Sequence, residues 1–91
     1  MQAEVEKLIK QVAAALERIQ FEYNRYFTGA EKKPPTQLRE KTEKDVEKLK
    51  AMLRQVQGAA ATQFSAQSTI QRYQSYRTLW DKKLAEREKT R

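Results

Sequence analysis

Apolar positions recur with helical spacing in three stretches of the chain, and polar positions fill the gaps between them. In the first stretch the spacing alternates between four and three residues for three heptads, which is typical of the seam of packed helices. This seam consists of Val5, Ile9, Val12, Leu16, Ile19, Tyr23 and Tyr26. The pattern predicts a helix over residues 2–28.

The strongest helix-breaking signals follow directly. Gly29 suits the position just after a helix end, whereas Pro34 and Pro35 cannot continue a helix but can open the next one. We therefore expect a loop at residues 28–34 and a second helix over about 35–57. The apolar stripe of this second helix consists of Leu38, Thr42, Val46, Leu49, Met52, Leu53 and Val56.

The joint between the second and third stretches has two interpretations. Either Gly58 ends the second helix and Thr62 caps a third, or the neighbouring alanines carry one helix straight through. A turn is favoured, because a helix over 35–89 would be much longer than globular proteins normally use. The third helix is then expected over 62–89. Its apolar face consists of Ala66, Ile70, Tyr73, Arg77, Trp80 and Leu84.

These elements predict an all-α fold, an antiparallel three-helix bundle (up-down-up) with coiled-coil-like packing and a single domain over residues 1–91. The first and third helices would run parallel, so that their C-terminal ends meet beside the proline loop. An aromatic cluster is expected there, made of Tyr23, Tyr26, Phe27, Trp80 and Leu84. The opposite end of the core is expected to hold Val5, Leu8, Met52, Val56 and Phe64.

Arg77 falls in the middle of an apolar face, where a buried guanidinium must be paired. Antiparallel pairing of the second and third helices about residue 60 leads us to expect an ion pair between Asp45 and Arg77. Glu17 and Glu22 are the substitutes. In the alternative interpretation, Arg77 opens into a cleft and binds an anion.

The formal net charge is +7, and residues 58–91 contribute much of it, with seven basic residues against three acidic. Beside the apolar face of the third helix lies a stripe made of Arg72, Tyr76, Lys83 and Arg87, with Leu79 among them. We expect this stripe to face solvent. Basic side chains flanking an aromatic ring are typical of contacts to RNA or single strands, although ordinary surface residues often form such stripes.

A second candidate site lies at the aromatic end of the predicted bundle. The basic residues around it are Arg25, Lys32, Lys33 and Arg39. This end of the bundle is where we expect a binding site.

The chain contains neither histidine nor cysteine, so the usual metal ligands, the imidazole base and the thiolate nucleophile are missing. Its two glycines stand apart and form no phosphate-binding loop. We therefore expect no enzyme, no metal, no cofactor and no small-molecule substrate. No apolar run approaches the roughly 20 residues that span a bilayer, and no export signal is visible. A soluble, cytoplasmic protein is expected.

Two blocks of the sequence resemble small, uncharacterised bacterial proteins. The first is FEYNRYFTGAEKKPPTQLRE and the second is QRYQSYRTLWDKKLAERE. Members of that family typically carry an arginine before the phenylalanine that opens the third helix, where this chain has Gln63 before Phe64. The departure weakens any anion-binding role for that position. The resemblance implies a helical-hairpin or three-helix fold and no established function.

Two functional hypotheses follow. In the first, the chain is a non-catalytic helical interaction module that binds a protein partner or associates with itself. In the second, it is a basic protein that binds RNA or single-stranded nucleic acid through its C-terminal helix. A role at a membrane surface is less favoured, because the core is expected to consume the apolar faces.

Overall fold

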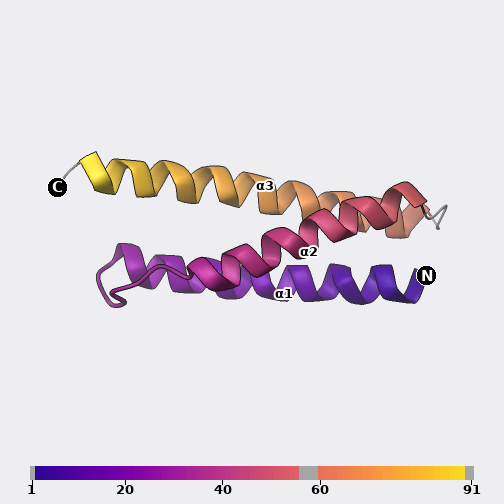
Figure 1. Ribbon diagram of the computed structural model, residues 1–91, viewed down its shortest axis with the longest axis horizontal. Coiled ribbons are helices and arrows are strands. Elements are labelled where there is room, and N and C mark those ends of the chain that lie inside the picture. The colour runs from indigo at the N-terminus through magenta and orange to yellow at the C-terminus, as the bar shows by residue number, and fades with distance from the viewer. Residues whose placement is uncertain (1, 56–59, 90–91) are drawn as a thin grey trace.

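The computed structural model describes residues 2–55 and 60–89, and three α-helices account for most of them. These are α1 (Gln2–Phe27), α2 (Thr36–Gln55) and α3 (Ala60–Lys89), with no strand in the two described ranges. Helices α1 and α3 run in the same direction and α2 runs against both (Figure 1). The all-α, up-down-up three-helix bundle expected from the sequence is confirmed.

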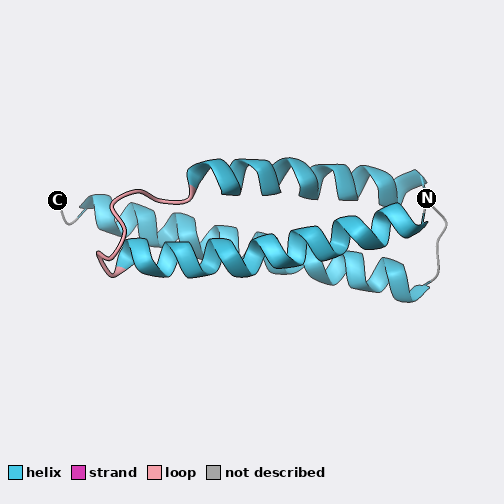
Figure 2. Cartoon of the chain, turned by 90° about the horizontal axis from the view of Figure 1, so that it is seen from below, coloured by secondary structure: helices cyan, strands magenta, loops and turns pink. Residues whose placement is uncertain are grey.

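The bundle is elongated, with principal extents of 49 × 19 × 18 Å. Helix α2 lies across the pair formed by the other two helices (Figures 1 and 2). It packs more extensively on α1 than on α3. The central helix of the fold is therefore α1, which contacts both neighbours along its length.

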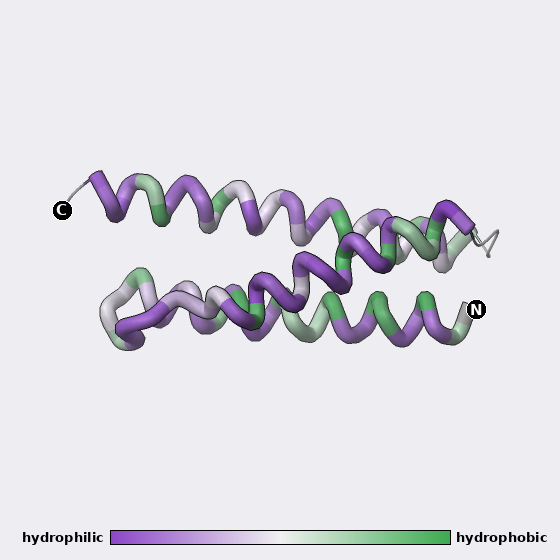
Figure 3. Tube along the Cα trace, viewed as in Figure 1, coloured by the Kyte–Doolittle hydropathy of each residue, from purple (hydrophilic) through white to green (hydrophobic). Residues whose placement is uncertain are grey.

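The apolar seam of α1 forms the middle of the core. Val12, Leu16 and Ile19 are fully buried, and the hydrophobic bands of this helix recur at the expected spacing (Figure 3). The rest of the expected seam is buried as well, apart from Tyr26, which is partly buried. Val46 and Leu49 of α2 complete the packing from one side. The prediction of the first helix and its inward face is confirmed.

The loop after α1 has the backbone conformation that its glycine and prolines predict. Gly29 has a φ of +88°, a left-handed conformation that side chains disfavour, and its N–H donates to the Tyr26 carbonyl at 3.2 Å. The Pro35 carbonyl accepts the N–H of Arg39 at 3.0 Å, which closes the first turn of α2. The end of α1 and the start of α2 therefore lie where Gly29 and the two prolines predict them.

The other end of the bundle differs from expectation in two respects. Helix α3 begins at Ala60, so Thr62 lies inside the helix instead of capping it. Phe64, expected in the core, is 74% exposed. It precedes the buried Ala66 by two residues, which places it about 200° away around the helix, on the outer side. The expected roles of Val56 and Gly58 lie outside the described residues.

The antiparallel arrangement of α2 and α3 excludes a single continuous helix from Pro35 to Lys89. Within the described ranges, no helix has the length and apolarity that crossing a membrane requires.

Candidate functional site

Trp80 is the centre of an aromatic cluster near the proline loop. Its side chain is 1% exposed, and the Tyr23 and Tyr76 rings stack on it at centroid distances of 4.9 and 5.7 Å. The Tyr73 ring meets it edge-on at 6.5 Å. The indole Nε1 donates to the Gln20 side-chain oxygen at 2.8 Å, which satisfies its one polar atom. The expected burial of Trp80 among aromatic residues is confirmed.

Arg39 links all three helices beside this cluster. Its guanidinium donates to the Tyr23 hydroxyl of α1 at 3.0 Å and to the Asp81 carboxylate of α3 at 2.6 Å. It also lies over the Trp80 ring, 5.9 Å from the centroid. Burial alone would lower the pKa of Arg39, but the hydrogen bonds to Tyr23 and Asp81 outweigh it and raise the pKa above its ordinary value. Arg39 is thus a charged structural tie and not an open basic contact.

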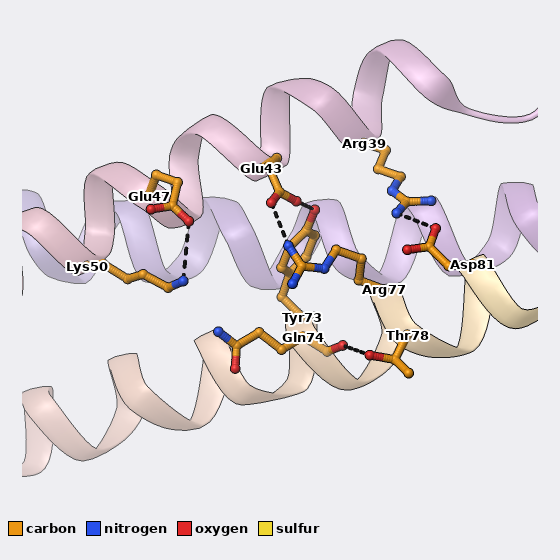
Figure 4. Close-up of polar contacts among 9 residues, drawn as sticks. All are labelled: Arg39, Glu43, Glu47, Lys50, Tyr73, Gln74, Arg77, Thr78 and Asp81. Carbon is orange, nitrogen blue, oxygen red and sulfur yellow. Dashed lines mark hydrogen bonds and ion pairs between the residues drawn. The ribbon is translucent and has the colours of Figure 1, made fainter.

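Arg77 forms its ion pair with Glu43, and the expected pair with Asp45 is wrong. The Arg77 Nη1 lies 2.7 Å from the Glu43 carboxylate, which also accepts a hydrogen bond from the Tyr73 hydroxyl (Figure 4). Asp45 instead lies 4.0 Å from Lys41 on its own helix. The alternative partners of Arg77 are wrong as well. Glu17 has no bond to Arg77, and Glu22 pairs with Arg18 at 3.6 Å.

The reason for this error is the direction of one side chain. Two ion pairs link α2 to α3, Arg39 with Asp81 and Glu43 with Arg77, and both fit one antiparallel register (Figure 4). The expected register about residue 60 is therefore correct. Asp45 follows Glu43 by two residues, so it projects about 200° away around α2 and cannot reach Arg77.

Tyr73 contributes a neutral hydroxyl to this polar seam between α2 and α3. Burial and the hydrogen bond to the Glu43 carboxylate both raise its pKa above the ordinary value of 10. The hydroxyl is consequently a donor at all physiological pH values. The Glu43 carboxylate receives one neutral and one charged donor from α3.

A cleft does lie beside Arg77, as the anion-binding alternative requires. It has a volume of about 640 Å³ and follows the seam between α2 and α3 near the proline loop. Three carboxylates line it together with the guanidinium groups of Arg39 and Arg77; they belong to Glu40, Glu43 and Asp81. This excess of negative charge disfavours an anion in the cleft.

The basic stripe of α3 is less exposed than expected. Tyr76 is covered on one side by the Trp80 ring. Lys83 lies 5.5 Å from the centroid of the Phe27 ring, and Arg87 lies 4.5 Å from that of Tyr26. All three of these stripe residues are partly buried, and only Arg72 is exposed. Two aromatic rings at the C-terminal end of α1 therefore attract two of the three cations of the stripe.

The basic residues of the aromatic end do not converge on one site. Arg25 lies 3.5 Å from Glu31, and its guanidinium lies 5.8 Å from the centre of the exposed Phe21 ring. Lys32 and Lys33 are exposed in the loop. Lys33 lines a separate hollow of about 590 Å³ beside the start of α2. Arg39 lies in a third environment, between Tyr23 and Asp81, so the four basic residues do not form a single site.

The outer face of α3, between Ala60 and Trp80, was predicted only in part, since Leu79 was expected there but Phe64 was expected in the core. Between Ala60 and Trp80, Arg72 is the only charged residue among the exposed ones. Phe64 is 74% exposed and Leu79 40% exposed on this face. The solvent-facing position expected for Leu79 is confirmed. The sequence does carry a signal for such a face, since no acidic residue occurs between positions 48 and 80.

A shallow hollow of about 440 Å³ lies in the middle of this face. Its lining residues are Ser68, Gln71, Arg72, Ser75 and Tyr76. The chemistry available there is hydrogen bonding by small hydroxyls, one amide and one guanidinium. Among residues 2–55 and 60–89, no group of acidic side chains is arranged to hold a metal ion.

Comparison of the chain with protein-family models, with curated proteins and with solved structures finds no match.

Replacing Glu43 with alanine should lower the free energy of unfolding by about 1–2 kcal/mol, because Tyr73 and Arg77 both lose their acceptor. Asp45→Ala is the matched control on the same helix and should change stability by less than about 0.5 kcal/mol. Urea titrations followed by circular dichroism measure both. A larger loss for the Asp45 variant would contradict the assignment of Glu43 as the partner of Arg77.

Proposed function

We propose that this chain is a non-catalytic helical interaction module that uses the outer face of α3 to bind another protein chain, either a partner or a second copy. The observation that carries the proposal is the near absence of charge on that face beside the exposed Phe64 and Leu79. Depletion of charged residues around exposed aromatic and aliphatic side chains is what marks the centre of protein interfaces.

The contrast with α2 supports this choice of face. The exposed positions of α2 are rich in charge; they include Glu40, Lys41, Lys44, Glu47, Lys48 and Arg54. Such a surface interacts well with water and has no need of a partner. The outer face of α3 lacks that solvation and leaves two large apolar side chains in water.

The fold itself does not require Phe64 or Leu79. The core closes around α1 without them, and no polar side-chain atom that is buried within the described residues lacks a hydrogen-bond partner. The bundle therefore gives no reason for these two apolar side chains to be exposed. Burial in an interface would give one.

Phe64→Ser combined with Leu79→Ser should reduce binding through this face at least about tenfold, since truncating one of the few residues that dominate an interface costs over about 1 kcal/mol. The measurement is capture by the immobilised chain of proteins from its source cells, and separately of a differently tagged second copy. Thermal unfolding should change much less than binding, because Phe64 is 74% exposed and Leu79, at 40% exposed, lies outside the core cluster.

The matched control is Phe21→Ser, which removes a 60% exposed ring from the outer side of α1. It should leave capture intact. Equal capture by the wild-type chain, the control and the α3 variant would contradict the proposal.

Binding of RNA or single-stranded nucleic acid is the second candidate, and the net charge of +7 supports it. Since the Tyr76 ring is stacked on Trp80 and Lys83 lies against Phe27, such binding would rest on phosphate contacts more than on base stacking.

If this candidate holds, replacing Arg72, Lys83 and Arg87 with glutamine should reduce the slope of log affinity against log salt by about 2 for single strands. The control removes the same charge from the exposed face of α2 through glutamine at Lys41, Lys44 and Lys48. Fluorescence anisotropy with a labelled oligonucleotide gives the slopes. Equal effects of the two triple variants would exclude α3 as a dedicated contact.

A further inference from the structure

The outer face of α3 has a symmetric order of residue types. About the midpoint between Gln71 and Arg72, Ser68 and Ser75 stand at equal distances on either side, and so do Phe64 and Leu79. Reading outward in either direction gives a long polar side chain, a small hydroxyl and a large apolar side chain. Their spacings of three, four and seven or eight residues keep them on one side of the helix.

The structure places this symmetric set away from the core. The two apolar residues, Phe64 and Leu79, are exposed, and the four inner residues of the set line the hollow of about 440 Å³ that lies between them. Neither α1 nor α2 covers the face, because both pack on the opposite side of α3, where Ala66, Ile70 and Tyr73 are buried.

We propose that this face binds the same face of a second copy, with the two α3 helices antiparallel and a two-fold axis at the Gln71–Arg72 midpoint. The inference rests on the proposed function and names its partner. In a two-fold interface, residue i of one copy contacts residue j of the other, and residue j of the first copy contacts residue i of the second. Only this pairing sets Phe64 of each copy against Leu79 of the other and Ser68 against Ser75.

The chemistry at the centre of this pairing is complementary. Arg72 has five N–H donors and lies opposite the Gln71 side chain of the second copy, whose amide oxygen is an acceptor. The same contact occurs twice. The serines on either side are small enough to let the two helices approach closely, so that the outer apolar residues can meet.

The proposed interface covers a short length of one helix from each copy. The paired segment from Phe64 to Leu79 is about 24 Å long, which makes a small interface with a dissociation constant expected in the micromolar range. Each copy carries a net charge of +7, so the copies repel one another at low ionic strength. Dimerisation should consequently strengthen with added salt, opposite to the behaviour of nucleic-acid binding.

Disulfide formation between single-cysteine variants tests the register directly, because the chain has no cysteine of its own. Ser68→Cys and Ser75→Cys are close in size to the wild type and are mixed, with distinguishable tags, under a mild oxidant. We expect the mixed disulfide to predominate. Identical positions lie about 10 Å apart along the helix in this pairing, too far for a disulfide.

Two outcomes of that experiment overturn the proposal. Predominant disulfides between identical positions indicate a parallel pairing. A yield of mixed disulfide no greater than that from Ala14→Cys with Ser75→Cys indicates random collision, because Ala14 is exposed on α1, outside the proposed interface.

A matched pair of substitutions at Gln71 provides an independent measurement by sedimentation equilibrium. Gln71→Glu places a carboxylate opposite each Arg72 of the second copy and should tighten the dimer about five- to tenfold, whereas Gln71→Lys should weaken it comparably. Both should leave the monomer fold intact, because residue 71 is exposed. No difference between the two variants contradicts the pairing.

The failure of this inference can be told from that of the proposed function. If the chain remains monomeric at 1 M salt and yet captures a different protein through Phe64 and Leu79, the dimer is wrong and the interaction module stands. If neither a second copy nor another protein binds through this face, both are wrong.

Discussion

The apolar seam of α1 is the constraint on which the rest of the structure depends. Val12, Leu16 and Ile19 are fully buried, and both other helices pack against the side on which they lie. The contact between α2 and α3 is of a different kind, since near the proline loop it consists of Arg39 with Asp81 and Glu43 with Arg77. These ion pairs are partly exposed and specify alignment more than they add stability. Apolar burial against α1 stabilises the bundle, and the ion pairs between α2 and α3 specify the register of those two helices.

Much of the fold could be predicted from the sequence, because helix periodicity and the Gly29 and proline signals act locally. The antiparallel register could also be predicted, but the expected partner of Arg77, Asp45, was wrong, because the pairing with Glu43 depends on the direction of the side chain. The exposure of individual side chains was harder to predict than their position along the helices. Lys83 borders the core but lies over an aromatic ring of α1, and the sequence of one helix does not reveal that ring.

The same packing explains why α3 presents a surface of its own. Helix α3 buries its aromatic side against α1 and α2, while its outer side between Ala60 and Leu79 carries one exposed charge, that of Arg72, and is covered by neither α1 nor α2. The exposed Phe64 was missed because a lone aromatic residue near a helix start looks like core in a sequence. Its proposed role in an interface is inferred from the neutral residues around it and from the symmetric position of Leu79.

Native-state hydrogen exchange tests the central role of α1 most directly. If burial on the α1 seam holds the bundle together, amides at Val12–Ile19 should exchange only through global unfolding and be the most protected in the protein. Amides in the first turns of α2, which the polar seam holds against α3, should exchange through smaller openings. Slower exchange in those turns of α2 than at Val12–Ile19 would contradict the account.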